Sequence, residues 1–159
     1  MPHAHNRSRS FPSLLLAGIL LLYSASGALA GGDWNDSAVD WKGYETGLAE
    51  AAKSGKPVCL IFYTDWCPHC AKYSNVFHDD KVIAKAKSFV MIRLNKDKNA
   101  ELSSRYAPDG EYIPRTFFLS SHGEVDDSIK APRDKFQFYY NPESPAELLV
   151  GMDRALGKN

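Results

Sequence analysis

The sequence predicts an α/β domain in which a central mixed sheet of four to five strands is flanked by helices. Val58–Tyr63 and Phe89–Leu94 are short and continuously apolar, as is typical of strands covered on both faces. A third run, Thr116–Leu119, leads into a turn at Gly123 and a short strand near Val125. The first two strands, with a helix between them, imply a right-handed parallel crossover, and the hairpin adds an antiparallel edge.

Helical spacing of apolar residues predicts the helices around this sheet. Trp41 to Ala52 carries an apolar stripe, and Gly55 and Pro57 end that helix. A second helix starts at Pro68, which is accepted in a first helical turn, and its apolar stripe is interrupted at Asp79-Asp80.

Two further helices complete the expected order. Ala100–Tyr106 predicts a short one. The last helix has Ser144 as its N-cap, Pro145 at its first position and Glu147 completing a capping box. The secondary structure of residues 130–141 stays open, because "FQFYY" within them fits either a strand or a packed loop.

The first thirty residues predict a secretory signal peptide rather than part of the fold. Arg7 and Arg9 give a basic start, Leu14–Tyr23 is an apolar core, and Ala28–Ala30 supplies the small-x-small cleavage pattern. A membrane anchor is the alternative, and the short apolar core disfavours it. We therefore expect cleavage after Ala30 and no stable membrane insertion afterwards.

Beyond the signal peptide (residues 1–30), we expect a flexible arm over residues 31–42 and one domain over residues 43–159. The two arginines are the only charged side chains of the signal peptide, out of 19 Lys+Arg and 19 Asp+Glu, so the exported chain is weakly acidic. This balance disfavours nucleic acid as a partner. We expect a monomer.

The three cysteines are Cys59, Cys67 and Cys70, and an odd number leaves at least one thiol outside any intramolecular disulfide. Cys67 and Cys70 form a C-x-x-C motif that follows a buried strand, is preceded by Trp66 and opens a helix. Unpaired N–H groups and the helix dipole favour a thiolate in a first helical turn. We therefore expect Cys67 to be the exposed attacking thiolate and Cys70 the more buried resolving thiol.

Trp66, before the first cysteine, and Pro68 and His69, between the two cysteines, are expected to tune the pair. A histidine that donates a hydrogen bond or carries positive charge stabilises the reduced form of Cys67. Stabilising the reduced form raises the reduction potential by about 30 mV for each ~1.4 kcal/mol. Pro68-His69 therefore favours an oxidant over a reductant, the alternative being a solvent-facing histidine without effect.

Two other functions for the same cysteines are disfavoured. A metal site would draw on Cys67, His69, Cys70 and His78, but structural zinc usually needs a second ligand pair at defined spacing. A purely structural disulfide would close too small a loop to constrain the unfolded chain. We expect no metal and no cofactor other than the redox-active Cys67–Cys70 disulfide, and Cys59 is interpreted as a small buried hydrophobe.

The C-x-x-C between strand and helix, with "YIPRTFFLSSHGEV" further on, resembles the thioredoxin superfamily over roughly Tyr44 to Leu156. The resemblance implies the thioredoxin fold and a cis peptide bond before Pro114. It also implies that Pro114 lies against the cysteine pair and lets a substrate strand bind the backbone of Ile113. From the sequence alone, Pro114 only opens a strand, where proline is tolerated.

Two subgroups share features with this chain. The tetrapeptide "CPHC" is similar to that of the periplasmic oxidases of the DsbA family, but the chain has no room for their helical insertion. "PDGEYIPRTFF" and the C-terminal stretch resemble the small endoplasmic-reticulum proteins of the anterior-gradient group. Those proteins end in a retention signal, whereas this chain ends in "LGKN". We therefore expect export by the general route to the periplasm of a Gram-negative bacterium.

The chain departs from the thioredoxin pattern at one position that matters for proton transfer. The resemblance places a buried acid six residues before the first cysteine, where this chain has Ile61. Asp65 is nearer to Cys67 but is expected to be exposed, and Arg93 stands where thioredoxins have a strand lysine. Without the acid, reductase turnover is impaired more than oxidation of substrate thiols.

The leading hypothesis is an exported protein thiol–disulfide oxidoreductase that favours oxidation or isomerisation. Its partners would be cysteine-containing proteins and a redox partner that the sequence does not identify. The alternatives are a thioredoxin-like reductase and a non-catalytic folding factor that holds peptides with the proline loop and the aromatic residues of 136–140.

Overall fold

The computed structural model describes Met1 and residues 31–157, and the predicted signal peptide lies outside these residues apart from Met1. A sheet of four strands runs in the order β1-β3-β2-β4. Strands β1 (Trp41–Lys42), β3 (Val90–Asn95) and β2 (Val58–Tyr63) are parallel, and β4 (Arg115–Leu119) is antiparallel to β2. The predicted α/β class with a mixed sheet is confirmed.

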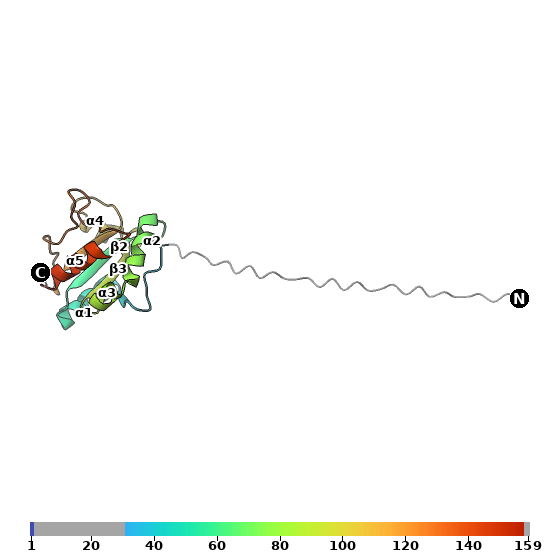
Figure 1. Cartoon of the computed structure of the whole chain (residues 1–159), viewed down its shortest axis with the longest axis horizontal. Helices are drawn as coiled ribbons and strands as arrows, with labels where there is room; N and C mark the ends of the chain where they lie inside the picture. The colour runs from blue at the N-terminus through green and yellow to red at the C-terminus, as the bar shows by residue number, and fades with distance from the viewer. Residues whose placement is uncertain (2–30, 158–159) are drawn as a thin grey trace.

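Alternating side chains of the strands divide the core into two layers. Cys59 and Ile61 of β2 face the layer completed by α2 (Pro68–Ser74), α3 (Asp80–Ala86) and α5 (Ala146–Ala155). Figure 1 shows these three helices over the near side of the sheet. Leu60 and Phe62 face the other layer, completed by α1 (Tyr44–Ser54) and α4 (Ala100–Arg105). Both faces of β2 are thus covered, which explains its continuously apolar sequence.

Short 3-10 turns link several elements. Helix α2 passes into η1 (Asn75–His78), and η2 (Lys96–Lys98) follows β3. The break expected at Asp79-Asp80 is the start of α3. There the Asp79 carboxylate caps the helix by accepting hydrogen bonds from the N–H groups of Lys81 and Val82, at 2.9 and 3.2 Å.

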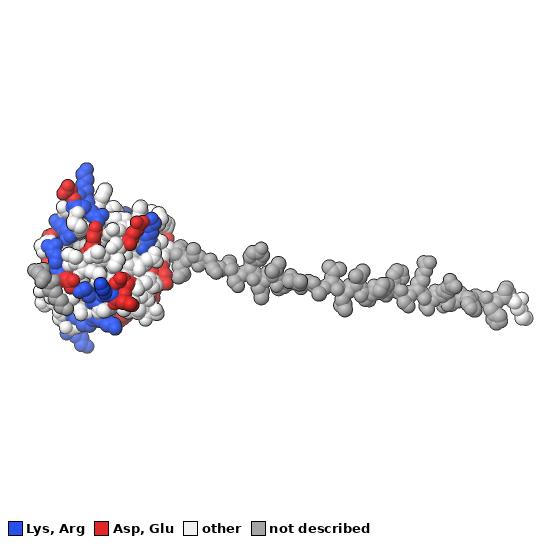
Figure 2. All heavy atoms as spheres, viewed as in Figure 1, with Lys and Arg blue, Asp and Glu red and all other residues white. Residues whose placement is uncertain are grey.

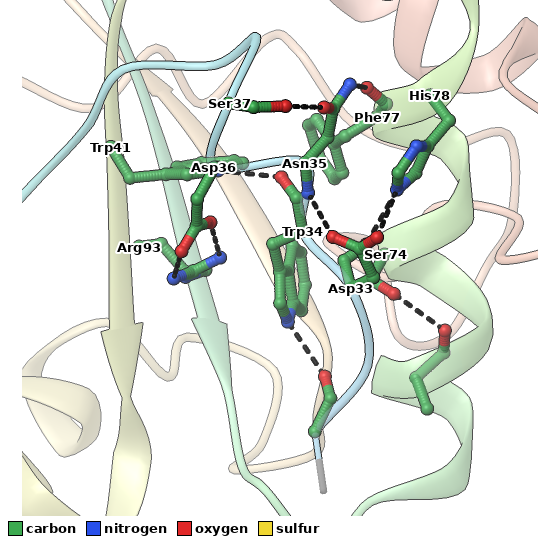
Figure 3. Close-up of polar contacts among 12 residues, drawn as sticks. Asp33, Trp34, Asn35, Asp36, Ser37, Trp41, Ser74, Phe77, His78 and Arg93 are labelled. Atoms are coloured by element: carbon green, nitrogen blue, oxygen red, sulfur yellow. Dashed lines mark hydrogen bonds and ion pairs between the residues drawn. The ribbon is translucent and has the colours of Figure 1, made fainter. Parts of the chain in front are cut away.

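The expectation of a flexible arm over residues 31–42 is wrong. Trp34 is only 3% exposed, and its ring contacts the rings of Trp41, Tyr63, Tyr73 and Phe77. Figure 3 shows the segment from Asp33 to Ser37 held beside Phe77 and His78. The arm is an integral part of the core because one large aromatic residue anchors it.

Trp41 does not belong to the first helix, contrary to the prediction. Trp41 and Lys42 form β1, which pairs with Met91 and Ile92 of β3, and α1 begins only at Tyr44. A strand of two residues is too short to show an alternating pattern in the sequence, and the spacing of Trp41 from Tyr44 and Leu48 also fits a helix.

The predicted strand near Val125 is reduced to a single bridge between Leu119 and Val125. Residues 130–141 form a packed loop rather than a strand. Phe138 and Tyr140 are 2% and 1% exposed, and the carbonyl of Phe138 accepts a hydrogen bond from the Thr116 N–H at 2.8 Å.

The capping box predicted for the last helix does not form. The N-cap is Pro145 rather than Ser144, and helix α5 begins at Ala146. The Glu147 carboxylate accepts a hydrogen bond from the Asn141 N–H at 2.8 Å and pairs with Arg133. Arg133 and the Asn141 N–H bind the Glu147 carboxylate, so Glu147 holds the 130–141 loop instead of capping the start of its own helix.

The surface carries charges of both signs. On the face shown in Figure 2, basic and acidic side chains are interspersed, and neither sign gathers into a patch. Among the residues that the structure describes, no helix has the length and apolar character needed to cross a membrane.

Candidate active site

The cysteine pair lies where the end of β2 passes into α2. Cys67 is the N-cap of α2 in an extended conformation, and Pro68 is the first helical residue. The Cys67 Sγ accepts a hydrogen bond from the Cys70 N–H at 3.2 Å. Both residues are free thiols in the structure. The sulfur of Cys67 is thus bound to a backbone donor of the first helical turn, as its position in the sequence predicts.

Cys67 is less accessible than expected. Its exposed fraction is 4%, whereas the sequence predicted an exposed thiolate, and Cys70 is 0% exposed. The carbonyl oxygen of Ile113 lies 3.9 Å from the Cys67 Sγ and helps to cover it. The predicted order of burial is right, but the loop before β4 shields the Cys67 sulfur.

That loop reaches the cysteines because of the sheet topology. Strand β4 is antiparallel to β2, and Arg115 at its start is opposite Phe62 near the end of β2. Ile113 and Pro114 immediately precede β4, so they meet the segment that follows β2. The Ile113–Pro114 peptide bond is cis, and Pro114 is buried. The structure therefore brings the carbonyl of Ile113, the residue directly before Pro114, to the sulfur of Cys67.

Burial governs the protonation of Cys70. Removal from water, followed by the hydrogen bond with Cys67, raises the pKa of the Cys70 thiol well above its ordinary value. Ile61, at the position where the resemblance placed an acid, is fully buried. Asp65 is exposed, and its carboxylate accepts a hydrogen bond from the Asn95 side chain at 3.0 Å. Cys70 is consequently a protonated thiol at neutral pH.

The residues expected to tune the pair lie on the rim of the site. His69 is exposed, and its Nδ1 shares a hydrogen bond of 3.2 Å with the Tyr139 hydroxyl. Pro68 is also exposed. Trp66 is 70% exposed, and its indole N–H donates to the Asp97 carboxylate at 2.8 Å. The imidazole of His69 therefore contacts Tyr139.

Three residues at this site were missed by sequence reasoning. Asn95 and Asp97 hold the loop before Cys67 through Asp65 and Trp66. Asn95 ends β3 and Asp97 follows it, and the carboxyl ends of parallel neighbouring strands meet at one edge of a sheet, so the sequence did contain a signal for them. Tyr139 gave no such signal, because it is 70 residues from His69 and lies in an irregular loop.

Arg115, directly after Pro114, is a further residue without a predicted role. It is fully buried and donates to the carbonyl oxygen of Gly110 at 2.9 Å and to that of Ser103 at 3.2 Å. Its burial lowers the pKa of the guanidinium, which is nevertheless charged at neutral pH. Arg115 thereby ties the loop that carries Ile113 to helix α4.

Other candidate residues lie apart from this chemistry. Cys59 is fully buried in β2, and burial raises the pKa of its thiol. His78 is exposed and contacts the Asp33 backbone carbonyl at 3.0 Å. Arg93 pairs with Asp36 at 2.8 Å. Within residues 31–157 no three side chains of His, Cys, Asp or Glu are grouped to hold a metal ion.

Phe138 and Tyr140 do not form the peptide-holding surface that the folding-factor alternative required. Both are buried, and of residues 136–140 only Phe136 is strongly exposed, at 54%. This weakens the alternative because most of the proposed contact area belongs to the core.

Comparisons with known proteins agree with this architecture. A family model described as thioredoxin-like matches residues 40–121, which include both cysteines and Pro114. The anterior gradient protein 2 homolog of Homo sapiens is 32% identical over 124 residues, covering 77% of this chain and 69% of the relative. Anterior gradient protein 3 of Mus musculus is 29% identical over 128 residues, covering 77% and 74%.

Solved structures of similar fold include a thioredoxin from Thermus thermophilus. It has a TM-score of 0.57 at 22% identity and covers 76% of this chain and 89% of that protein. The oxidoreductase DsbH has a TM-score of 0.55 at 18% identity, covering 99% and 96%. These similarities establish the thioredoxin fold predicted from the sequence.

Proposed function

Because the chain belongs to the thioredoxin-like family, we propose that it is an exported protein thiol–disulfide oxidoreductase acting through Cys67 and Cys70. The observation that carries the proposal is the Cys67 Sγ at the N-terminus of α2, bound to the Cys70 N–H at 3.2 Å. This arrangement supplies a backbone donor to the Cys67 sulfur and keeps Cys70 within the same helical turn.

In the oxidising direction, the pair begins as a disulfide. A substrate thiolate attacks the Cys67 Sγ, the Cys67–Cys70 bond breaks, and Cys70 leaves as a thiolate that takes up a proton. A second substrate thiolate then attacks the substrate sulfur of the mixed disulfide, and Cys67 leaves as a thiolate. Two electrons pass from the substrate to the pair, and a redox partner that accepts them restores the disulfide.

A backbone N–H donated to the Cys67 sulfur supports the lean toward oxidation or isomerisation, because it stabilises the reduced form of the pair. In the reductase direction, Cys70 must lose its proton before it can attack the mixed disulfide. Burial opposes that loss, and Ile61 supplies no carboxylate to accept the proton. The same burial makes Cys70 a slower leaving group in the oxidising direction, so its raised pKa slows exchange both ways. A thioredoxin-like reductase remains the alternative.

Cysteine-containing proteins are the proposed substrates. The carbonyl of Ile113 lies 3.9 Å from the Cys67 Sγ, so a substrate strand bound to the Ile113 backbone would present its cysteine to that sulfur. Trp66 offers an exposed apolar ring beside it. We further propose that the protein acts as a monomer in the periplasm after the signal peptide is removed.

Trapping of the mixed disulfide tests this proposal. The variant Cys70→Ser cannot resolve the intermediate, so incubation with a peptide disulfide should accumulate a covalent adduct that peptide mapping places on Cys67. The matched variant Cys67→Ser should form no adduct. Accumulation of adduct on Cys59, or on neither cysteine, would contradict the proposal.

A further inference from the structure

The chain from Gly31 onward is fixed against the segment that leads into the cysteine pair. The Trp34 indole N–H donates to the carbonyl of Gly31 at 2.8 Å. The Asn35 side chain donates to the carbonyl of Phe77 at 2.9 Å. Figure 3 shows Trp34 pointing down between the arm and the sheet, with Asn35 directed at Phe77. These contacts hold the first residues of the arm in one place.

Gly31 and Gly32 fit this place because they have no side chains. Their φ angles are +94° and +85°, in the region that favours glycine. A Cβ on Gly32 would lie 2.3 Å from the Ser74 Oγ and 2.8 Å from the Cα of Ala71 in helix α2. A Cβ on Gly31 would lie 2.9 Å from the Asp65 Oδ1. The Asp65 carboxylate therefore lies beside Gly31, in the space that a side chain would occupy.

The cations near this carboxylate have other partners. A cavity of about 580 Å³ is lined by Gly31, Asp33, Asp36, Asp65, His78 and Arg93, among others. Arg93 binds Asp36 through both of its terminal nitrogens, at 2.8 and 3.3 Å. His78 lies 3.5 Å from the Asp33 carboxylate. Asp65 accepts a hydrogen bond at Oδ2 from the neutral amide of Asn95, while its Oδ1 faces Gly31.

The cleavage pattern of the sequence ends at Ala30, immediately before this glycine. Hydrolysis of the Ala30–Gly31 bond consumes one water, leaves a carboxylate on Ala30 and leaves an α-ammonium on Gly31. We propose that Asp65 binds this new α-ammonium, so that processing completes an ion pair next to the cysteine loop. The inference rests on the export proposed above but not on the redox activity.

The ion pair between Asp65 and the α-ammonium of Gly31 has a structural consequence. Asp65 is two residues before Cys67 and is already held by Asn95, so the ammonium ties the processed N-terminus to the loop that positions the active site. The contact is exposed on the side of Asp65, so its contribution to stability is modest. It is also specific to a chain that begins at Gly31.

A double-mutant cycle on exported protein tests the proposal. The full gene is expressed with its signal, with and without a Gly-Ser dipeptide inserted between Ala30 and Gly31, and each form is made with and without Asp65→Asn. Mass spectrometry should place the natural N-terminus at Gly31. The dipeptide displaces the ammonium and should lower the Tm by about 3 °C with Asp65 present.

The dipeptide should have no effect on the Tm once Asp65→Asn is present. Loss of the Asn95 contact affects both forms equally and cancels in the cycle. The exposed Asp134→Asn is the matched control and should leave the effect of the dipeptide unchanged. An N-terminus elsewhere than Gly31 would overturn the inference, as would equal effects of Asp65→Asn in both forms.

If the inserted form is not exported, the reactivity of the α-amine gives a second measurement. A paired amine is acylated more slowly near neutral pH, where lysine side chains react little because their pKa values are higher. Acylation of the Gly31 amine should be roughly threefold faster in Asp65→Asn than in the unchanged protein. Equal rates would overturn the pairing, whereas failure of disulfide exchange would bear only on the proposed function.

Discussion

Cys59 and Cys67 are close in the sequence and almost equally buried, at 0% and 4% exposed, yet their surroundings differ. Cys59 lies within β2, between its partners Met91 and Phe118 on the neighbouring strands. Cys67 lies at the N-terminus of α2, accepts the Cys70 N–H and touches the Ile113 carbonyl. Burial alone therefore does not distinguish a structural thiol from a reactive one. The backbone donors and the second sulfur do.

The largest expected effect separates the two cysteines by activity. Cys67→Ser should reduce exchange with a peptide disulfide to the uncatalysed rate, because the attacking sulfur is gone. Cys59→Ala should leave the rate unchanged, since Cys59 lies within β2 and supplies neither the attacking nor the resolving sulfur. Comparable losses in the two variants, measured under the same conditions, would show that the comparison is mistaken.

The second expected effect is on stability, where substitution of Cys59 should cost more than substitution of Cys67. Cys59→Ser buries a hydroxyl among apolar side chains and should lower the free energy of unfolding by about 1–3 kcal/mol. Cys67→Ser places the hydroxyl beside a backbone N–H and should cost less than Cys59→Ser. Urea denaturation of both variants checks the order, and a larger loss in Cys67→Ser would contradict it.

Much of this contrast was predictable from the sequence, and some of it was not. The apolar run Val58–Tyr63 indicated a covered strand, and the C-x-x-C after it indicated a helix N-terminus. The shielding of Cys67 was not predictable, because it comes from Ile113, 46 residues away, brought in by the antiparallel strand. Likewise, nothing local showed that Trp34 is buried, since its ring partners come from distant elements.

The third prediction concerns pH. Burial raises the pKa of both Cys59 and Cys70, so these thiols stay protonated in the folded dithiol protein while unfolded cysteines ionise above about pH 8.5. The unfolded state then binds fewer protons, and stability falls with rising pH. Each thiol contributes about 1.4 kcal/mol per pH unit between roughly pH 8.5 and 10, above which tyrosines join.

Two comparisons isolate these contributions. Cys59→Ala should reduce the pH slope by the share of one thiol, and so should formation of the Cys67–Cys70 disulfide, which removes the proton of Cys70. Unfolding curves at several pH values in this window give the slopes. A slope that neither change alters would argue against the buried, protonated state of these thiols.

The smallest expected effect concerns Tyr139. Its hydroxyl shares a hydrogen bond with the His69 Nδ1 and holds the imidazole beside the pair. Tyr139→Phe should lower the reduction potential by less than about 30 mV, which corresponds to ~1.4 kcal/mol. Phe136→Leu, at an exposed ring of the same loop, is the control and should not change it. An unchanged or higher potential in Tyr139→Phe would show that Tyr139 does not tune the cysteine pair.

The equilibrium of the Cys67–Cys70 pair with glutathione shows whether the pair is an oxidant or a reductant of protein thiols. Protein with Cys59→Ala is equilibrated in buffers of graded glutathione and glutathione disulfide, and the oxidised fraction is measured after acid quenching. We expect a single two-electron transition at a potential well above that of thioredoxin, which is about −270 mV. A potential at or below the thioredoxin value would contradict the oxidising direction, and the absence of any transition would contradict the redox pair itself.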